Sequence, residues 1–254
     1  MKRILSMLLV FCLMLGSLLA LSACDKKDEA DEGSENGNGD GGSGVAQYTT
    51  YQMPLFSYKV PSDWTKMPLA EETDSASFMK SSGSDVSMLV ISGSISAVEE
   101  EDYEPLGKAT RRTFAEREVD AREEASGDYW SAEEKREMVE DLLDSGFSIT
   151  DEALFEWWQE GQTGNSTAVL EEAVLLKNDD YDLAFVLCGQ GGMSGEPIYE
   201  YVYTYMSDCF VAEDEDGEPY LAAYVLNFSL TVSGERNDAL YREILGGIEW
   251  KNQE

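Results

Sequence analysis

The sequence predicts a mixed domain of the α/β class, α+β type, in which an antiparallel β-sheet is flanked by helices. Three observations predict this fold. Segments that alternate between apolar and polar residues occur on both sides of a helical block, the block itself is acidic, and an amphipathic helix comes near the end of the chain. Strands on either side of a helical block, followed by a last helix, are typical of a sheet whose faces are covered by helices.

The first strands of the predicted sheet lie before residue 92. Residues 48–64 alternate in polarity and break at Pro61-Ser62-Asp63, which predicts an entry strand followed by a turn. Two more strands are predicted at 76–80 and 85–91, joined by a Gly-Ser turn.

A helical insert is predicted from about residue 98 to about residue 161. Its clearest helix is 131–145, because Ser131 and Glu134 fit a capping box and the next two residues, Gly146-Phe147, fit a Schellman stop. Residues 103–125 carry a weaker apolar stripe and are also predicted as a helix. A third short helix is predicted from 150 or 151 through 159, with acids in its first turn.

The chain then returns to strands. Residues 169–176 and 181–188 predict a hairpin, although 168–177 also fits a helix. A longer hairpin is predicted from 198–211 and 220–232, which turns through 213–218. The last helix is capped by Asn237 and is followed by a short strand. Its inward face is predicted to hold Leu240, Tyr241, Ile244 and Leu245.

Residues 1–23 have the pattern of a secretory signal peptide, with basic residues at 2 and 3, an apolar run, and small residues at the end. The run ends in Leu21-Ser22-Ala23-Cys24, which resembles the lipobox of bacterial lipoproteins. The resemblance implies that Cys24 carries fatty acyl chains such as palmitate and holds the protein on the extracytoplasmic face of a bacterial cell membrane. The alternative is an uncleaved transmembrane helix, for which the run is barely long enough.

Residues 24–47 predict a disordered, acidic, Gly-rich tether. After Cys24, the stretch 25–44 contains no large apolar residue that could offset the entropy lost on ordering. A flexible coil of this length spans about 25 Å on average, well beyond a Debye length of about 8 Å. We therefore expect a single domain at 48–254, held away from the lipid surface.

The net charge of −33 excludes whole classes of partner. Nucleic-acid binding depends on Lys and Arg side chains that release counterions from phosphates, so we expect no nucleic-acid partner. Adsorption on anionic lipid also needs clustered basic residues. Attachment to the membrane is therefore expected to depend on the lipid anchor alone.

Two cysteines, Cys188 and Cys209, are available to a mature domain. An extracytoplasmic location would allow a disulfide between them. In a simple hairpin, however, they would lie opposite Pro197 and Leu176, too far apart to bridge. The alternative is two small, buried, free thiols.

Two segments of the domain carry a family resemblance. They are Tyr58-Lys59-Val60-Pro61-Ser62-Asp63-Trp64 and Asp238-Ala239-Leu240-Tyr241-Arg242-Glu243-Ile244-Leu245 followed by Gly246-Gly247-Ile248. They look like the two ends of the PsbP-like fold of many bacterial lipoproteins, although the helical insert is longer than in that family. The resemblance implies an α/β sandwich that serves as a docking or accessory module. The resemblance does not indicate which residues of this chain would contact a partner.

The absence of histidine removes several kinds of chemistry. It excludes Ser-His-Asp and Cys-His nucleophiles and His-ligated metal sites. The sequence also contains no Cys-rich metal spacing and no phosphate loop, so we expect no cofactor, no metal and no catalytic residue. The acidic stretch 212–218 lacks the acidic residues that an EF-hand loop needs at its first and last positions. It is therefore predicted as a hairpin turn. Carboxylates are the remaining reactive class, and a glycosidase needs two of them at a set separation.

Two groups of aromatic residues are candidates for a partner surface. One is a stripe of alternating tyrosines in a predicted strand, and the other is a pair of adjacent tryptophans on a predicted helix. The alternative for the tyrosines is that the helical insert covers them. The two tryptophans point about 100° apart, so we expect that one interface does not bury both rings. The residues are Tyr199, Tyr201, Tyr203, Tyr205, Trp157 and Trp158.

Together these features predict a membrane-anchored lipoprotein that binds another cell-envelope component, a protein or a glycan, without catalysis. The alternative is a carboxylate-dependent hydrolase that acts on envelope polysaccharide. An enzyme should show a concave pocket that holds two or more acids, at least one of them partly buried. A binding module should show an exposed aromatic or apolar patch instead.

Overall fold

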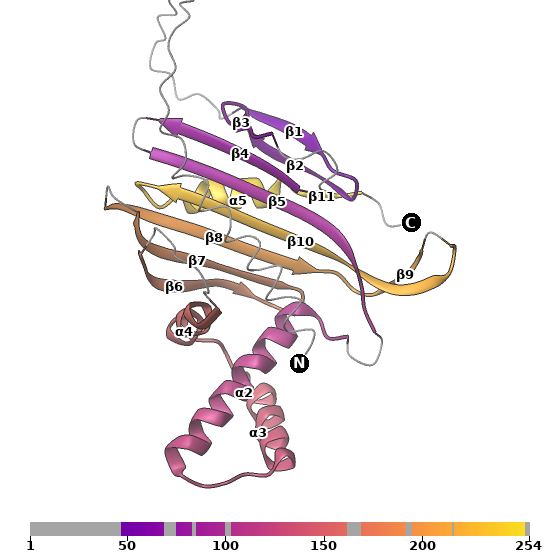
Figure 1. The fold of residues 1–254 in the computed structure, drawn as a ribbon, viewed down its shortest axis with the longest axis vertical. Helices are drawn as coiled ribbons and strands as arrows, with labels where there is room; N and C mark the ends of the chain where they lie inside the picture. Colours follow the sequence, from indigo (N-terminus) through magenta and orange to yellow (C-terminus); the bar gives the residue numbers. More distant parts are fainter. Residues whose placement is uncertain are drawn as a thin grey trace, which may run out of the picture.

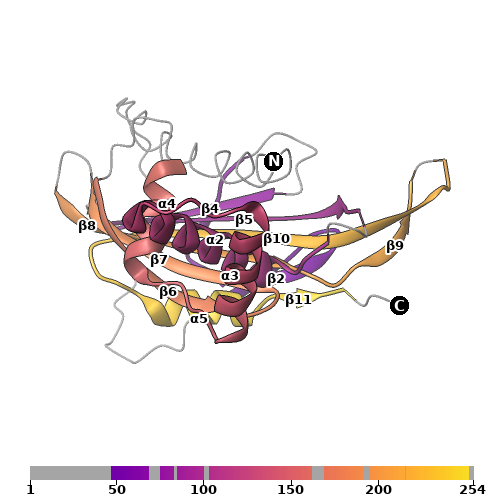
Figure 2. The ribbon, with the colours of Figure 1, turned by 90° about the horizontal axis from the view of Figure 1, so that it is seen from below.

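The computed structural model describes residues 47–68, 75–82, 85–99, 103–161, 169–191, 195–214 and 216–251. These residues form antiparallel sheets with helices on their faces, which confirms the predicted α+β class (Figures 1 and 2). Within these ranges, none of the helices is long and apolar enough to cross a membrane.

The larger sheet has eight strands in the order β3-β4-β5-β10-β8-β7-β6, with β9 paired to β10. Strand β10 lies between β5 and β8, so it joins the strands that precede the helical insert to those that follow it. The strands are β3 Thr65–Lys66, β4 Ser75–Ser82, β5 Asp85–Ala97, β6 Val169–Asn178, β7 Asp182–Gly191, β8 Glu196–Met206, β9 Phe210–Glu213 and β10 Pro219–Ser233.

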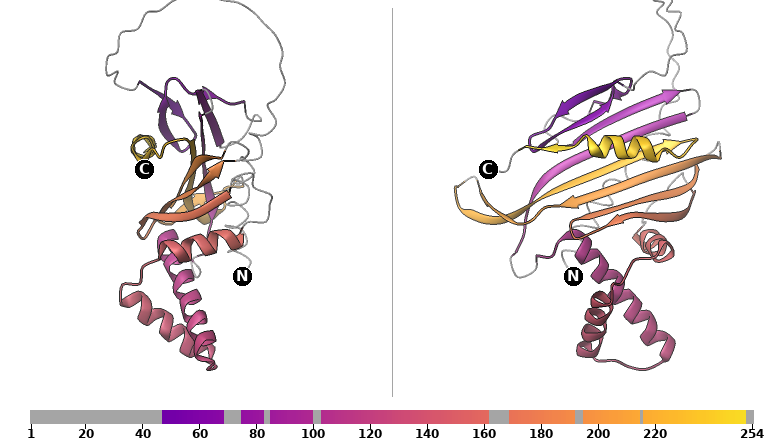
Figure 3. Two further views of the ribbon diagram at one scale, coloured as in Figure 1. Left: turned by 90° about the vertical axis from the view of Figure 1, so that its left-hand side faces the viewer. Right: turned by 180° about the vertical axis from the view of Figure 1, so that it is seen from behind.

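A smaller sheet brings the two ends of the domain together. It has the order β1-β2-β11, formed by Tyr48–Gln52, Phe56–Pro61 and Glu249–Trp250. Together with helix α5 (Asp238–Gly246) it covers one face of the larger sheet (Figure 3). The core between them is aromatic, with Phe56, Tyr58, Phe78 and Phe228 fully or almost fully buried.

The insert forms helices α2 (Leu106–Ser126), α3 (Ala132–Asp144) and α4 (Asp151–Gly161). The start of α2 and the apolar face of α4 pack on the opposite face of the larger sheet. Helix α3 packs on α2 through a separate small cluster of buried residues, Ala115, Val119 and Val139.

The predicted ends of α3 are confirmed. The Ser131 backbone N–H donates to Glu134 Oε2 at 2.7 Å, and the Glu134 N–H donates back to the Ser131 hydroxyl at 3.3 Å. At the other end Gly146 has φ +84°, and the N–H groups of Gly146 and Phe147 donate to Leu143 and Leu142. Local sequence therefore fixes both ends of this helix.

Three strand predictions need correction. Residues 48–64 form the hairpin β1–β2 instead of one entry strand, because the chain turns between Gln52 and Phe56. The helical alternative for 168–177 is wrong, since β6 pairs with β7. The predicted strand 198–211 is broken between Met206 and Phe210, where it carries one more residue than β10 opposite. In this bulge the Ser207 hydroxyl accepts the N–H of Tyr224 at 2.9 Å.

A close backbone approach fixes the insert to the sheet. Gly107, in the first turn of α2, donates its N–H to the carbonyl of Asp180 at 3.0 Å. A Cβ at this position would overlap the Asp179 backbone. Arg111, one turn later, donates to the Asn178 carbonyl at 3.1 Å and to the Asp180 carboxylate at 2.6 Å. Helix α2 is therefore positioned by the β6–β7 turn.

We predict that Gly107→Ala destabilises the protein by about 1–3 kcal/mol, because the added methyl group must displace backbone. For a chain of this size that lowers the melting temperature by about 2–4 °C per kcal/mol, measured by circular dichroism. The control is Gly161→Ala in α4, whose Cβ would meet nothing within 4 Å. Equal melting temperatures for the two variants would contradict the close approach.

Candidate functional site

The predicted tyrosine stripe lies on the β8 face that is covered by α5. Tyr201 is 0% exposed and stacks on Tyr241 with ring centroids 4.9 Å apart. Its hydroxyl donates to Asp238 Oδ1 at 2.7 Å and accepts the N–H of Asn237 at 3.0 Å. Tyr201 therefore serves as a core residue that holds the start of α5.

The other three tyrosines of the stripe, Tyr199, Tyr203 and Tyr205, are half-buried against the same core. Their cover also differs from the predicted alternative, in which the helical insert lies on them. The insert packs on the opposite face of the sheet, because β8 alternates and presents Val202 and Met206 to it. Only parts of these three rings are open to a ligand.

The predicted tryptophan pair lies on that opposite face, on α4. Trp158 is 6% exposed and stacks on Phe155, whereas Trp157 is half-buried beside Phe114 at 5.7 Å. The prediction that one interface does not bury both rings is confirmed. Because the sheet separates them, the tryptophans and tyrosines do not form one continuous surface.

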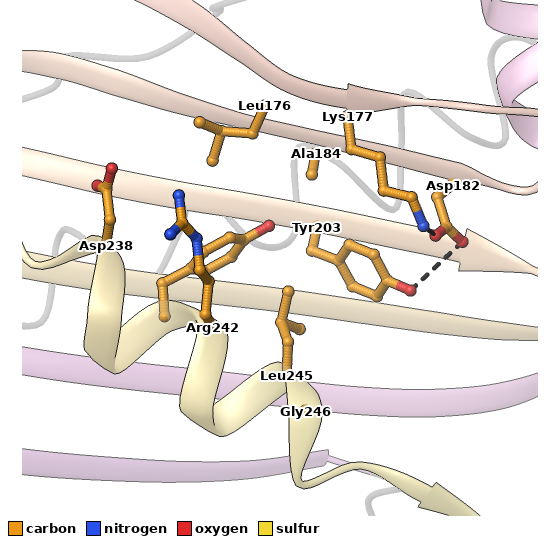
Figure 4. Close-up of a pocket in the computed structure, with 10 residues that line it drawn as sticks. Leu176, Lys177, Asp182, Ala184, Tyr203, Asp238, Arg242, Leu245 and Gly246 are labelled. Atoms are coloured by element: carbon orange, nitrogen blue, oxygen red, sulfur yellow. Dashed lines mark hydrogen bonds and ion pairs between the residues drawn. The ribbon is translucent and has the colours of Figure 1, made fainter.

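A pocket of about 380 Å³ lies between α5 and strands β6, β7 and β8 (Figure 4). It combines apolar walls, two tyrosine rings and charged side chains of both signs. It is lined by Leu176, Lys177, Asp182, Ala184, Tyr203, Asp238, Tyr241, Arg242, Leu245 and Gly246.

One end of the pocket is formed by an ion pair and a phenol. Lys177 pairs with Asp182, and also with Asp179 at 3.0 Å. The Tyr203 hydroxyl donates to Asp182 Oδ1 at 3.3 Å. The hydrogen bond with Asp182 raises the pKa of Lys177, and burial followed by the nearby Asp182 charge raises the pKa of Tyr203. Both groups therefore keep their protons at neutral pH.

The other end of the pocket is the first turn of α5. Asp238 accepts two hydrogen bonds from Arg236, at 2.7 and 3.1 Å, in addition to the one from Tyr201. The Arg236 hydrogen bonds are the main cause that lowers the pKa of Asp238. Figure 4 shows Asp182 and Asp238 at opposite ends of the pocket, with Arg242 between them.

These charged residues were not predicted from the sequence. One sequence feature could have drawn attention to Arg242: it is a charged residue within the apolar pattern of the last helix, between Tyr241 and Ile244. A second feature concerns Asp182, which is a charged residue at the start of β7, the strand that is most completely buried on both faces. Neither signal indicates that the two residues share a pocket, which depends on how α5 packs across β6 and β7.

A further carboxylate lies away from the pocket, on the opposite face of β8. Glu200 is 4% exposed, and its Oε1 accepts a hydrogen bond from Ser229 at 3.3 Å. Its Oε2 has no hydrogen-bond partner within the described residues. Burial raises the pKa of Glu200 to about 7. The acid with the raised pKa is thus separated from the two pocket acids by the sheet.

The remaining sequence candidates lie in turns and strands. The 213–218 turn is confirmed, since Asp214 Oδ1 accepts the N–H groups of Asp216 and Glu218 and Gly217 has φ +80°. Cys188 is buried in β7 beside Tyr199, Cys209 is half-buried after β8, and the two do not form a disulfide with each other. In the part of the chain that the structure describes, no group of three or more acidic or Cys side chains is arranged to hold a metal ion. Cys24 lies outside the described residues.

No known protein family matches this chain, and a comparison with curated protein sequences finds no match. The geometry of the pocket is therefore the basis for a functional proposal.

We predict that the stability of the protein falls by about 3 kcal/mol as the pH rises from 4.5 to 7, through Glu200 alone. Over this range the unfolded chain releases the Glu200 proton whereas the folded chain, with a pKa of about 7, retains it. Ionisation therefore favours unfolding, and the loss is complete once the folded carboxyl also ionises. Urea unfolding of wild type and Glu200→Gln at both pH values measures the difference.

The matched control for this prediction is Glu213→Gln, a change at an exposed carboxylate in β9. It should leave the pH dependence of unfolding unchanged. If Glu200→Gln has the same pH dependence as wild type, Glu200 does not hold its proton in the folded state.

Proposed function

We propose that this protein is a lipid-anchored binding or accessory module for another component of the cell envelope, and that the pocket beside α5 contacts its ligand. One observation carries the proposal. Both pocket carboxylates, Asp182 and Asp238, already pair with cations of the protein itself. The hydrogen bonds from Arg236 lower the pKa of Asp238, so this carboxylate stays ionised and cannot donate the proton that a general acid must supply.

The pocket also has the size and lining of a binding site. Its volume lies within the usual range of about 300–1,000 Å³ for small-molecule sites. Leu176, Ala184 and Leu245 give it apolar walls, and charged groups lie at its ends. This combination of apolar surface with a few polar groups orients a ligand without any chemical step.

The alternative function is a carboxylate-dependent hydrolase of envelope polysaccharide. One specific observation favours it, because the pocket holds two acids and Asp182 is only 7% exposed. Against it, the acid with a raised pKa, Glu200, lies on the other face of the sheet. A paired-acid mechanism needs its proton donor beside its second carboxylate.

The finer fold assignment belongs to this proposal. We propose a PsbP-like sandwich because the two segments that resemble that family meet in the folded chain. Strand β2 pairs with β11, which follows α5 directly. The resemblance supports a docking or accessory role and names no partner.

The proposed location follows from the lipobox-like sequence at 21–24. Acylation of Cys24 would hold the domain at the extracytoplasmic face of the membrane, and two acyl chains give durable attachment where one does not. The net charge of −33 argues against direct contact with anionic lipid. The acidic stretch after Cys24 would then act as a spacer.

We predict that Cys24→Ser releases the protein from the membrane fraction into the medium or periplasm and abolishes incorporation of labelled palmitate. Fractionation of expressing cells followed by immunoblotting measures the release. Cys12→Ser, within the apolar run, is the matched control and should remain in the membrane. Retention of the Cys24→Ser protein in membranes would contradict the lipid anchor.

For the pocket, we predict that Leu245→Glu weakens binding of envelope-derived peptides or oligosaccharides at least about tenfold, because it places a charge in an apolar wall. Ligand-observed NMR with the purified fragments measures the binding. Ala239→Glu, on an exposed position of the same helix, is the control. Release of reducing sugars by the wild type, lost in Asp182→Asn, would establish the hydrolase instead.

A further inference from the structure

The outer edge of strand β9 is open within the described part of the chain. Strand β7, which pairs with β8, begins at Asp182, opposite Tyr205, so it does not extend along β9. Among the described strands, β9 pairs with β10 alone. Figure 2 shows β9 and the end of β10 projecting beyond the other strands. No described strand therefore takes, beside β9, the position that β7 takes beside β8.

The backbone groups of Val211 and Glu213 point toward this open edge. Val98 donates its N–H to the carbonyl of Leu221, so the backbone groups of Leu221 are directed toward β5. Leu221 lies opposite Val211, and backbone groups alternate between the two edges along a strand. The N–H and C=O groups of Val211 and Glu213 therefore face away from β10. An edge of this kind can pair with an extended segment of another chain.

Apolar side chains lie beside the open edge on both faces of the sheet. On one face, the side chain of Val211 is 69% exposed. On the other face, Phe210 stacks on Tyr224 with ring centroids 4.4 Å apart, and the centroids of Tyr224 and Trp250 are 5.7 Å apart. All three rings are half-buried. An added strand would bury more of this apolar surface and would be stabilised by cross-strand contacts with it.

The charge around β9 restricts the kind of strand that can be added. In the described residues of β9 and of the segments that flank it, the acids are exposed and none forms an ion pair with a described residue. The sequence has no Lys or Arg between Lys177 and Arg236. The acids are Asp208, Glu213, Asp214, Asp216 and Glu218.

These acids act in opposite ways on two kinds of partner. They repel a second copy of this chain, whose net charge is −33, and so they protect the edge from pairing with itself. They attract a strand that carries Lys or Arg. The edge is therefore open to a basic partner and closed to the protein's own copies.

We propose that β9 is a docking edge for an extended basic segment of another protein, which adds a strand beside Val211 and Glu213. Alternate side chains of the added strand face opposite sides of the sheet. Its apolar side chains pack on Val211, and its Lys or Arg side chains lie over the Phe210 ring, where cation–π contact and the nearby carboxylates favour them. No residue of β9 lines the α5 pocket, so this inference goes beyond the proposed function and does not depend on it.

The test uses the full chain, purified in a non-ionic detergent, and three hexapeptide probes. The first alternates lysine and valine, the second has the same sequence with every backbone nitrogen methylated, and the third has glutamate in place of lysine. Amide hydrogen exchange measured by NMR reports on the N–H groups of Val211 and Glu213. The Lys-Val peptide at saturation should slow both at least about tenfold, because it hydrogen-bonds them. The other two probes should leave both rates unchanged.

Two variants test the edge itself. Val211→Pro removes one N–H from the open edge, a position where proline is tolerated, and should weaken binding of the Lys-Val peptide at least about tenfold. Val211→Lys keeps the strand and the N–H but repels the basic peptide, and should weaken binding about two- to fivefold. The matched control is Val169→Lys, at a valine of β6 that is 67% exposed, and it should bind the peptide as the wild type does.

Four results would overturn the inference. One is equal slowing of exchange by the methylated peptide, which would show that charge alone holds the probe. Another is slowing by the Glu-Val peptide, and a third is no slowing by the Lys-Val peptide up to about 1 mM. The fourth is slowing that increases with protein concentration in the absence of peptide, which would show that a second copy of the chain occupies the edge.

Discussion

The large sheet is covered on both faces by different parts of the chain, and this constraint governs the rest of the structure. Strand β7 is buried along almost its whole length because α5 lies on one side and the insert on the other. Successive side chains of a strand point to opposite faces. The neighbouring strand β8 therefore sends its tyrosines into the α5 core and sends Glu200 and Val202 into the face packed by the insert.

This sorting separates two kinds of acidic group. Asp182 and Asp238 lie on the α5 side, where they pair with Lys177 and Arg236, and the hydrogen bonds from Arg236 lower the pKa of Asp238. Glu200 lies on the other side without a cation, and burial raises its pKa to about 7. Removing a charge from water costs free energy unless an opposite charge compensates it, so the pKa values of Asp238 and Glu200, on opposite sides of the sheet, shift in opposite directions.

The pocket lies along the side of α5 that faces strands β6 and β7. Tyr241 and Ile244 of the helix are buried in the core, whereas Arg242 is exposed at the side that faces β6. The start of the helix is fixed by the Asn237 cap and by the hydroxyl of Tyr201. A cap and a buried phenol thus determine where Arg242 and Leu245 stand relative to the strands.

The sequence by itself determined the class of fold, the ends of α3, the Asn237 cap and the 213–218 turn, because each depends on residues close together in the chain. It also indicated that Trp157 and Trp158 would differ in burial, since helix geometry alone separates their directions. Only the tertiary structure decided that α5, and not the insert, covers the tyrosines, that residues 207–209 form a bulge, and that Lys177, Asp182, Asp238 and Arg242 share a pocket. These features depend on contacts between segments separated by tens of residues, which neither periodicity nor local capping can specify.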